Sequence, residues 1–366
     1  MLVFSSNRRK LGGDMNAHVA NLKSYLAEHY EAAEWPTLLE QAEQWQQTRP
    51  LAGLRILDAT PVFHNTLAKY LALLSAGAEL FIPARPAICD PAALQLARTF
   101  GIRAAGKQDT DFDIILDCAG QFNRLHPTLG FCELTRSGVA RLERVHHPVF
   151  VADDGRIKRI ETILGTGDGF FRALEQLGYG EVAGKALLVV GYGKVGRGVV
   201  LHAQQRGMRI TVADVRDVRD ELPTGVRYCG MDDPAELTKV MVSAWCVVTC
   251  SGRINALRRR MDASAVHNSA TLLANLGVED EYGADISPER VLNRKIPLNF
   301  ILEEPTAMRY IETTMALHNA CALELLTADL PHRLMPPPAD VEARLLHTAA
   351  TRGVIGKEIG RLGSLN

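Results

Sequence analysis

Three features are missing from this sequence, and each absence excludes a class of protein. No apolar run reaches the ~20 residues that a membrane span needs, and no Cys-X-X-Cys pair occurs among the seven cysteines. Neither charge sign is in excess, because 41 Lys and Arg stand against 42 Asp and Glu. The sequence therefore gives no case for a membrane protein, a metal site, or a basic surface for nucleic acid.

The cysteines are odd in number and scattered, which argues against a disulfide framework and for a reducing compartment. Basic residues follow a short apolar start at the N-terminus, the reverse of a signal peptide. We therefore expect a cytoplasmic protein. Its 366 residues, 47% of them apolar, are enough for two ordinary globular domains.

Strand and helix patterns alternate along two parts of the chain. In the first part, Leu54–Ala59 is predicted as a strand, His64–Ser75 as a helix and Glu79–Pro83 as the next strand. Buried strands follow at 112–120 and 149–154. A second series, with strands at 186–190, 209–213, 245–250 and 270–276, starts after position 161. Such alternation predicts an α/β fold with doubly wound parallel sheets.

A glycine turn follows the first strand of the second series. Residues 187–200 read LLVVGYGKVGRGVV, in which Gly191, Gly193 and Gly196 form a G-x-G-x-x-G pattern between an apolar strand and a helix. The first glycine makes a tight turn, the second lets the backbone approach a pyrophosphate, and the third packs helix on strand. Lys194 and Val195 complete the turn, whose helix start faces the phosphates.

Asp214 stands 18 residues beyond Gly196, at the end of the next strand. A carboxylate there accepts hydrogen bonds from the hydroxyls of the adenosine ribose. It also repels a 2′-phosphate, so we expect NAD as the cofactor in preference to NADP. Arg216 and Arg219 follow closely and would soften this preference, unless they are solvated loop charges.

The stretch EVAGKALLVVGYGKVGRG resembles the cofactor loop of the S-adenosylhomocysteine hydrolases, or adenosylhomocysteinases. FDIILDCAG, ELTRSGVARL and VADDGRIKRIETILGTGDGFFRAL resemble further segments of that family, in the same order, so the similarity covers roughly residues 50–330. Members of the family oxidise a ribose hydroxyl with bound NAD, eliminate a thiol, add water and regenerate the cofactor. The resemblance implies two Rossmann-like domains: a split substrate domain of residues 1–164 and 305–366, and an NAD-binding domain of residues 165–304.

The resemblance also implies cofactor contacts outside the glycine turn. Thr135 and Ser137 stand in a hydroxyl-rich turn that contacts the nicotinamide half in the family. Asn275 lies in the segment that lines the cofactor, and Asn299 stands where an Asn holds the carboxamide. The alternative for each of these side chains is a local cap of its own turn.

Most of the family's catalytic positions carry different residues in this sequence. Its presumed base is Cys118 here, although Asp117 stands beside it, and its substrate-domain His falls at Pro61, three residues before His64. In its lysine–aspartate segment, the aligned lysine is replaced by Ile157. The sequence offers Lys158, one position later, and Glu161 in place of the Asp.

We expect Lys158 and Glu161 to handle the hydroxyl group, because hydride abstraction from an alcohol needs a group that takes the proton. The two residues are three apart and can meet in a helix; the alternative is an exposed ion pair. Asp117 and His64 are candidates for positioning substrate or moving protons. Their alternatives are a turn cap for Asp117 and a capping or quietly buried role for His64.

The C-terminal GKEIGRLGSLN carries no counterpart of the family's Tyr-bearing arm, which suggests less tightly held or exchangeable NAD. The leading hypothesis is an NAD-dependent enzyme that takes hydride from a hydroxyl-bearing, nucleoside-like or other small molecule different from S-adenosylhomocysteine. The alternatives are a genuine adenosylhomocysteinase with a rebuilt site and a non-catalytic dinucleotide-binding protein. We expect a homodimer or homotetramer that binds neither nucleic acid nor membrane.

Overall fold

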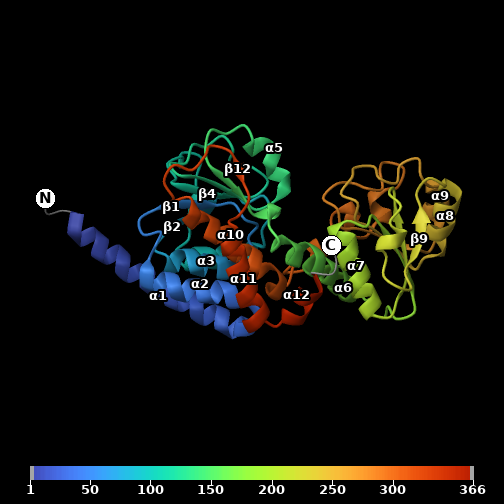
Figure 1. Ribbon diagram of the computed structural model, residues 1–366, viewed down its shortest axis with the longest axis horizontal. Helices are drawn as coiled ribbons and strands as arrows, with labels where there is room; N and C mark the ends of the chain where they lie inside the picture. Colours follow the sequence, from blue (N-terminus) through green and yellow to red (C-terminus); the bar gives the residue numbers. More distant parts are fainter. Residues whose placement is uncertain (1–3, 363–366) are drawn as a thin grey trace. The chain divides into compact units, whose positions relative to one another are not determined.

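The computed structural model describes the backbone of residues 4–362 and the side chains of residues 16–362. The chain divides into two compact units: unit 1 is Met1–Ile160 with Met308–Asn366, and unit 2 is Glu161–Ala307 (Figure 1). The predicted boundaries, after residues 164 and 304, lie four and three residues from the observed ones.

Unit 1 is built on a parallel sheet of seven strands in the order β12-β6-β5-β4-β1-β2-β3. The strands are β1 Arg55–Asp58, β2 Glu79–Pro83, β3 Arg103–Ala105, β4 Ile114–Asp117, β5 Gly130–Glu133, β6 Val149–Val151 and β12 Leu334–Met335. Because β1 lies beside β4, the chain winds outwards in both directions from this pair. Ligands of doubly wound sheets bind outside the carboxyl ends of such a pair.

The helices of unit 1 include one layer of five that pack on one another: α1 Phe4–His29, α2 Pro36–Thr48, α3 Thr66–Ser75, α10 Met308–Glu324 and α11 Ala339–Arg352 (Figure 1). Every residue of α3 is buried, so this helix is enclosed on all sides, as its apolar composition requires. The remaining α-helices are α4 Pro91–Thr99, α5 Val139–Leu142 and α12 Gly356–Leu362.

Unit 2 contains a parallel sheet of five strands in the order β11-β10-β7-β8-β9. The strands are β7 Ala186–Val190, β8 Arg209–Asp214, β9 Arg227–Gly230, β10 Cys246–Thr249 and β11 Leu272–Asn275, and the α-helices are α6 Thr166–Gln176, α7 Lys194–Gln205, α8 Pro234–Ser243 and α9 Ala263–Asn268. Leu187 and Val189 pack with α6 and α7, whereas Leu188 and Val190 pack with α8. Helices therefore cover both faces, which explains why β7 is apolar throughout.

The two sheets confirm the predicted α/β fold class with doubly wound parallel sheets. The sequence pattern overlooked the short strands β3, β5, β9 and β12, which lie away from the central pair of each sheet. All seven cysteines are free thiols, and five of them are buried. Within residues 4–362, no helix combines the length and the apolar character needed to cross a membrane.

Candidate functional site

The glycine turn joins β7 to α7 in unit 2. Each of its three glycines is required for a different physical reason. Gly191 has φ +98°, and a Cβ on it would lie 2.7 Å from Cα of Ser251. A Cβ on Gly196 would lie 2.0 Å from the Gly191 carbonyl oxygen. A Cβ on Gly193, in contrast, would meet nothing within 4 Å. Two glycines thus allow close packing, and the space at Gly193 is open to a ligand.

Asp214, at the end of β8, is bound to the same turn. Its Oδ2 accepts a hydrogen bond from the Tyr192 backbone N–H at 2.7 Å, and its Oδ1 accepts one from the Arg216 N–H at 2.9 Å. A carboxylate has about four acceptor sites, so each oxygen retains capacity for a ribose hydroxyl. The side chain is 9% exposed, which keeps it rigid while leaving an edge accessible.

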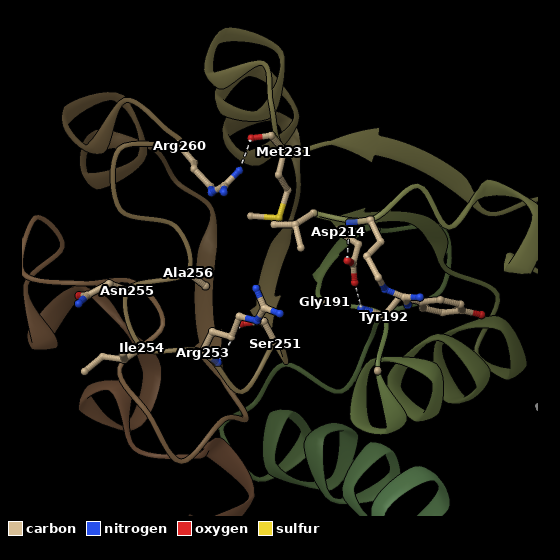
Figure 2. A pocket seen from close by; sticks show the side chains of 13 residues that line it. Gly191, Tyr192, Asp214, Met231, Ser251, Arg253, Ile254, Asn255, Ala256 and Arg260 are labelled. Carbon is tan, nitrogen blue, oxygen red and sulfur yellow. Dashed lines mark hydrogen bonds between the residues drawn. The ribbon is translucent and has the colours of Figure 1, made fainter.

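A pocket of about 330 Å³ opens at this turn, lined by residues of the turn, of the β8 end and of the loop after β10 (Figure 2). It lies at the carboxyl ends of β7 and β10, the neighbouring strands at which the strand order reverses. The lining residues are Gly191, Tyr192, Gly193, Asp214, Val215, Arg216, Met231, Ser251, Arg253, Ile254, Asn255, Ala256 and Arg260.

These residues fit a dinucleotide. The open space at Gly193 lets a pyrophosphate approach the backbone. The 12-residue helix α7 begins beside it with Lys194 and Val195, and the first N–H groups of a helix have no partners within the helix. Asp214 could supply an acceptor for a ribose hydroxyl.

The other predicted cofactor residues make local contacts. Asn275, fully buried at the end of β11, accepts from the Thr249 hydroxyl at 2.8 Å, and its amide nitrogen lies 2.6–3.0 Å from three carbonyl oxygens that share its two N–H groups. The Asn299 amide donates to the Pro305 carbonyl at 3.2 Å. In unit 1, the Thr135 hydroxyl donates to Glu133 at 2.9 Å and lies 2.8 Å from the Ser137 hydroxyl. These contacts favour the capping alternative, and their roles towards a cofactor remain predictions.

Asp117 at the end of β4 is fully buried, and its carboxylate caps the loop that follows. It accepts hydrogen bonds from the backbone N–H groups of Cys118, Gln121 and Phe122 at 2.7–3.0 Å. Burial raises the pKa of Asp117 to about 7 against the effect of these donors. Both oxygens are turned towards their own loop, which is the geometry of a turn cap. The substrate role of Asp117 stays a prediction.

Glu133, at the end of β5, has a similar role that the sequence analysis missed. It is fully buried and accepts hydrogen bonds from the N–H groups of Ala119, Gly120 and Thr135 at 2.8–2.9 Å. Two neighbouring strand ends therefore use their carboxylates to hold one loop, residues 118–122. A carboxyl group at the end of a short buried strand is the signal that would have identified Glu133.

The remaining predicted catalytic residues are His64, Lys158 and Glu161. His64 lies in the turn before α3, with Nδ1 4.0 Å from Oδ1 of Asp90. Lys158 belongs to unit 1 and is 3% exposed. Glu161 belongs to unit 2, in the π-helical segment Ile160–Gly165. The pairing of Lys158 with Glu161 therefore stays a prediction.

The structure reveals a buried polar cluster in unit 1 that the sequence analysis did not identify. Asp58 ends β1; its carboxylate accepts a hydrogen bond from the Lys69 ammonium of α3 and another from the Thr60 N–H at 2.8 Å. Burial lowers the pKa of Lys69, although Asp58 opposes this shift. The pair lies next to the carboxyl end of β1, at the reversal point of the first sheet.

His318 of α10 is part of this cluster. Its Nε2 lies 2.8 Å from the Cys132 carbonyl oxygen, and since a carbonyl only accepts, Nε2 carries the proton. Nδ1 is buried and has no hydrogen-bond partner among the described residues. Burial, followed by the charge of Lys69 and a smaller effect of Lys158, lowers the pKa of His318 to about 3. The imidazole is therefore neutral over the physiological range.

Among the residues that the structure describes, no group of three or more His, Cys, Asp or Glu side chains is arranged to hold a metal ion.

Comparisons with known proteins place the chain among distant relatives. No family model matches it. It is 28% identical to the adenosylhomocysteinase of Sulfurisphaera tokodaii over 61% of this chain and 60% of that protein, so the match spans less than two thirds of that relative. It is 26% identical to the adenosylhomocysteinase of Gloeobacter violaceus over 75% of this chain and 72% of the relative.

Two solved structures align with about three quarters of this chain. A transhydrogenase from Sinorhizobium meliloti aligns with 74% of this chain and 95% of its own, at 16% identity and a TM-score of 0.42. A dipicolinate synthase chain from Bacillus halodurans aligns with 76% of this chain and 99% of its own, at 12% identity and a TM-score of 0.48. Neither likeness informs the function.

The sequence matches confirm the predicted resemblance: the chain is distantly similar to adenosylhomocysteinases. They also support the prediction of NAD as the cofactor. The relatives are named as enzymes, which favours an enzyme here, but identities of 24–28% do not identify its reaction.

Proposed function

We propose that this distant relative of adenosylhomocysteinases binds NAD in the pocket of unit 2 and exchanges hydride with a hydroxyl-bearing small molecule other than S-adenosylhomocysteine. The observation that carries the proposal is the glycine turn, which is open at Gly193 and bound at its base by the Asp214 carboxylate. A turn of this kind at the carboxyl ends of β7 and β10 is the expected geometry for a dinucleotide.

Different residues of the chain bind the cofactor and accept the substrate proton in this proposal. The backbone at Gly193 and the start of α7 hold the pyrophosphate, and Asp214 holds the adenosine ribose. NAD, when bound, supplies the hydride acceptor. Lys158 is almost fully buried, and a buried amine in its neutral form takes the proton of a substrate hydroxyl. Glu161 would orient that amine.

Adenosylhomocysteine hydrolysis is the second candidate, favoured by the sequence relatives. We rank it second because Asp117, which stands beside the position of the family's base, directs both carboxylate oxygens into its own loop. A carboxylate that caps three backbone N–H groups is poorly placed to take a proton from substrate. A dinucleotide-binding protein without turnover is the third candidate.

Cofactor binding is tested by titration calorimetry of the purified protein with NAD+ and with NADH. In parallel, the protein is denatured and any released nucleotide is identified by mass. We expect binding of at least one form. Absence of heat with both forms, for protein that melts cooperatively, would refute the proposal.

Hydride transfer is tested by absorbance at 340 nm with NAD+ and a panel of alcohols and nucleosides. Lys158→Met should abolish reduction and leave NAD+ affinity unchanged, whereas Lys107→Met, at an exposed lysine of unit 1, should behave as wild type. Wild-type turnover in Lys158→Met would eliminate the proposed proton acceptor. Release of adenosine and homocysteine from S-adenosylhomocysteine would instead establish adenosylhomocysteine hydrolysis. If no compound of the panel reduces NAD+, a dinucleotide-binding protein without turnover would be favoured.

A further inference from the structure

One wall of the unit 2 pocket carries an arginine whose side chain is not engaged by the protein. Arg253 lies in the loop after β10, and its guanidinium makes no hydrogen bond or ion pair with any residue that the structure describes. The two other arginines of the pocket are engaged. Arg216 lies 3.6 Å from the Glu221 carboxylate, and Arg260 donates to the Met231 carbonyl at 3.0 Å.

The backbone that carries Arg253 is held firmly. The buried Glu281 accepts hydrogen bonds from the N–H groups of Ser251 and Gly252 at 2.8 and 2.7 Å, and from the Ser251 hydroxyl at 2.6 Å. The Ser251 hydroxyl in turn accepts from the Arg253 N–H at 3.2 Å. The arginine is thus fixed at its base while its charged end stays available.

This loop lies against the glycine turn. A Cβ on Gly191 would come within 2.7–2.9 Å of backbone atoms of Cys250 and Ser251, so Gly252 is the one residue between this point of contact and Arg253. Figure 2 shows the Arg253 side chain directed from its loop into the pocket, towards the side on which Gly191 and Asp214 lie. An available guanidinium therefore faces the space in which the glycine turn would hold phosphates.

We infer that Arg253 binds the pyrophosphate of the dinucleotide from the β10 side of the pocket, adding a charged contact to the backbone contacts of the glycine turn. The inference rests on the proposed function and assigns a specific role to a residue outside the glycine motif. A guanidinium is always charged and presents a planar fork of donors that matches phosphate oxygens. Asp214, the pocket's carboxylate, is already bound to two backbone N–H groups and does not neutralise it.

The test compares three ligands that differ in their phosphates: NAD+, ADP-ribose and adenosine. Affinities are measured by calorimetry, with adenosine also used as a competitor. Arg253→Gln removes the charge, and Arg253→Lys keeps the charge without the fork. Arg258→Gln is the matched control, because Arg258 is exposed on the same loop and does not line the pocket. Thermal melting checks the fold of each variant.

We expect Arg253→Gln to weaken NAD+ and ADP-ribose by about 10- to 100-fold, the range for a hydrogen bond to a charged group, and to leave adenosine unchanged. Arg253→Lys should lie between this variant and wild type, and Arg258→Gln should match wild type. Added salt should weaken ADP-ribose binding less in Arg253→Gln than in wild type, because one ionic contact is gone.

Two results would overturn the inference while leaving the proposed function intact: wild-type affinity of Arg253→Gln for ADP-ribose, or an equal loss of adenosine and ADP-ribose, which would assign Arg253 to the nucleoside. A wild-type protein that binds no NAD+ would overturn the proposed function itself and this inference with it.

Discussion

The Lys69 ammonium donates a hydrogen bond to the Asp58 carboxylate inside unit 1, and both side chains are completely buried. Removing two charges from water has an unfavourable free energy. Their attraction offsets it only when the geometry is good and the remaining donors and acceptors of both groups form hydrogen bonds. Asp58 meets this condition in part through the Thr60 N–H. The pair also joins β1 to α3, the helix enclosed on all sides.

Removing one partner of this pair should destabilise unit 1 strongly. Lys69→Met leaves the Asp58 carboxylate buried without its counter-charge, and we expect a loss of about 3–5 kcal/mol in the free energy of unfolding. The double variant Asp58→Asn/Lys69→Met should lose clearly less than the sum of the single variants, since no charge is then left behind. Denaturant unfolding of the four proteins measures this coupling; strict additivity would show that the two residues act independently.

Two glycine substitutions should separate cofactor binding from folding. Gly193→Ala adds a methyl group to open space, so the melting temperature should stay unchanged while NAD+ affinity falls by about tenfold or more, equivalent to about 1.4 kcal/mol. Gly196→Ala places its methyl group on the Gly191 carbonyl and should lower the melting temperature. Unchanged NAD+ affinity of Gly193→Ala would mean that the pyrophosphate does not lie at this turn.

Asp214 should contribute to both the turn and the cofactor. Asp214→Ala removes two acceptors of backbone N–H groups and the ribose contact, so we expect lower thermal stability and NAD+ binding weaker by about 1–2 kcal/mol. Asp214→Asn keeps one oxygen acceptor and should lose less of both. Asp220→Ala, at an exposed acid nearby, is the control. Wild-type NAD+ affinity in Asp214→Ala would remove the ribose assignment.

Stability should fall as the pH rises towards 8, partly because of Glu312. This buried carboxyl group of α10 caps the start of α2, where it accepts from the N–H groups of Thr37 and Leu38 at 3.1 Å. Burial raises its pKa from the ordinary 4.5 to about 7. Between these values the folded state binds more protons than the unfolded state, so the stabilisation is complete below about pH 4.5 and is lost as the pH rises through 7.

Glu312→Gln tests this origin, because the amide is neutral at every pH and its oxygen can still accept from α2. The free energy of unfolding should decline by less in the variant between pH 5 and pH 8. Each pH unit by which folding raises the pKa of Glu312 corresponds to about 1.4 kcal/mol of the decline. Some decline should remain, since burial also raises the pKa of Asp117 to about 7. An identical pH dependence in both proteins would contradict this assignment.

The residues close to the glycine turn were predictable because their chemistry is local. The turn, its strand and its helix are contiguous, and Asp214 follows at the end of the next strand. The ends of β1 and β4 were also visible in the sequence, whereas β5 was not, and the sequence did not tell which way the carboxylates at these strand ends turn. Asp117 and Glu133 point into one loop and Asp58 towards α3, which depends on loop geometry.

The cluster around Lys69 could be predicted from the sequence even less well. Lys69 lies 11 residues from Asp58, but His318 reaches the Cys132 carbonyl over 186 residues of chain. Nothing in the periodicity of α10 indicates which strand it will cover. Arg253 likewise looks like an ordinary loop charge until the loop after β10 is placed against the glycine turn.

The sequence by itself determined the doubly wound α/β fold, the glycine turn and its carboxylate, because hydrophobic periodicity and backbone constraints act over a few residues. Only the tertiary structure decided which charges are buried together, which strand-end acids serve as caps and which arginine faces the pocket. These properties depend on packing between distant segments, where burial changes the energy of a charge far more than its neighbours in sequence do.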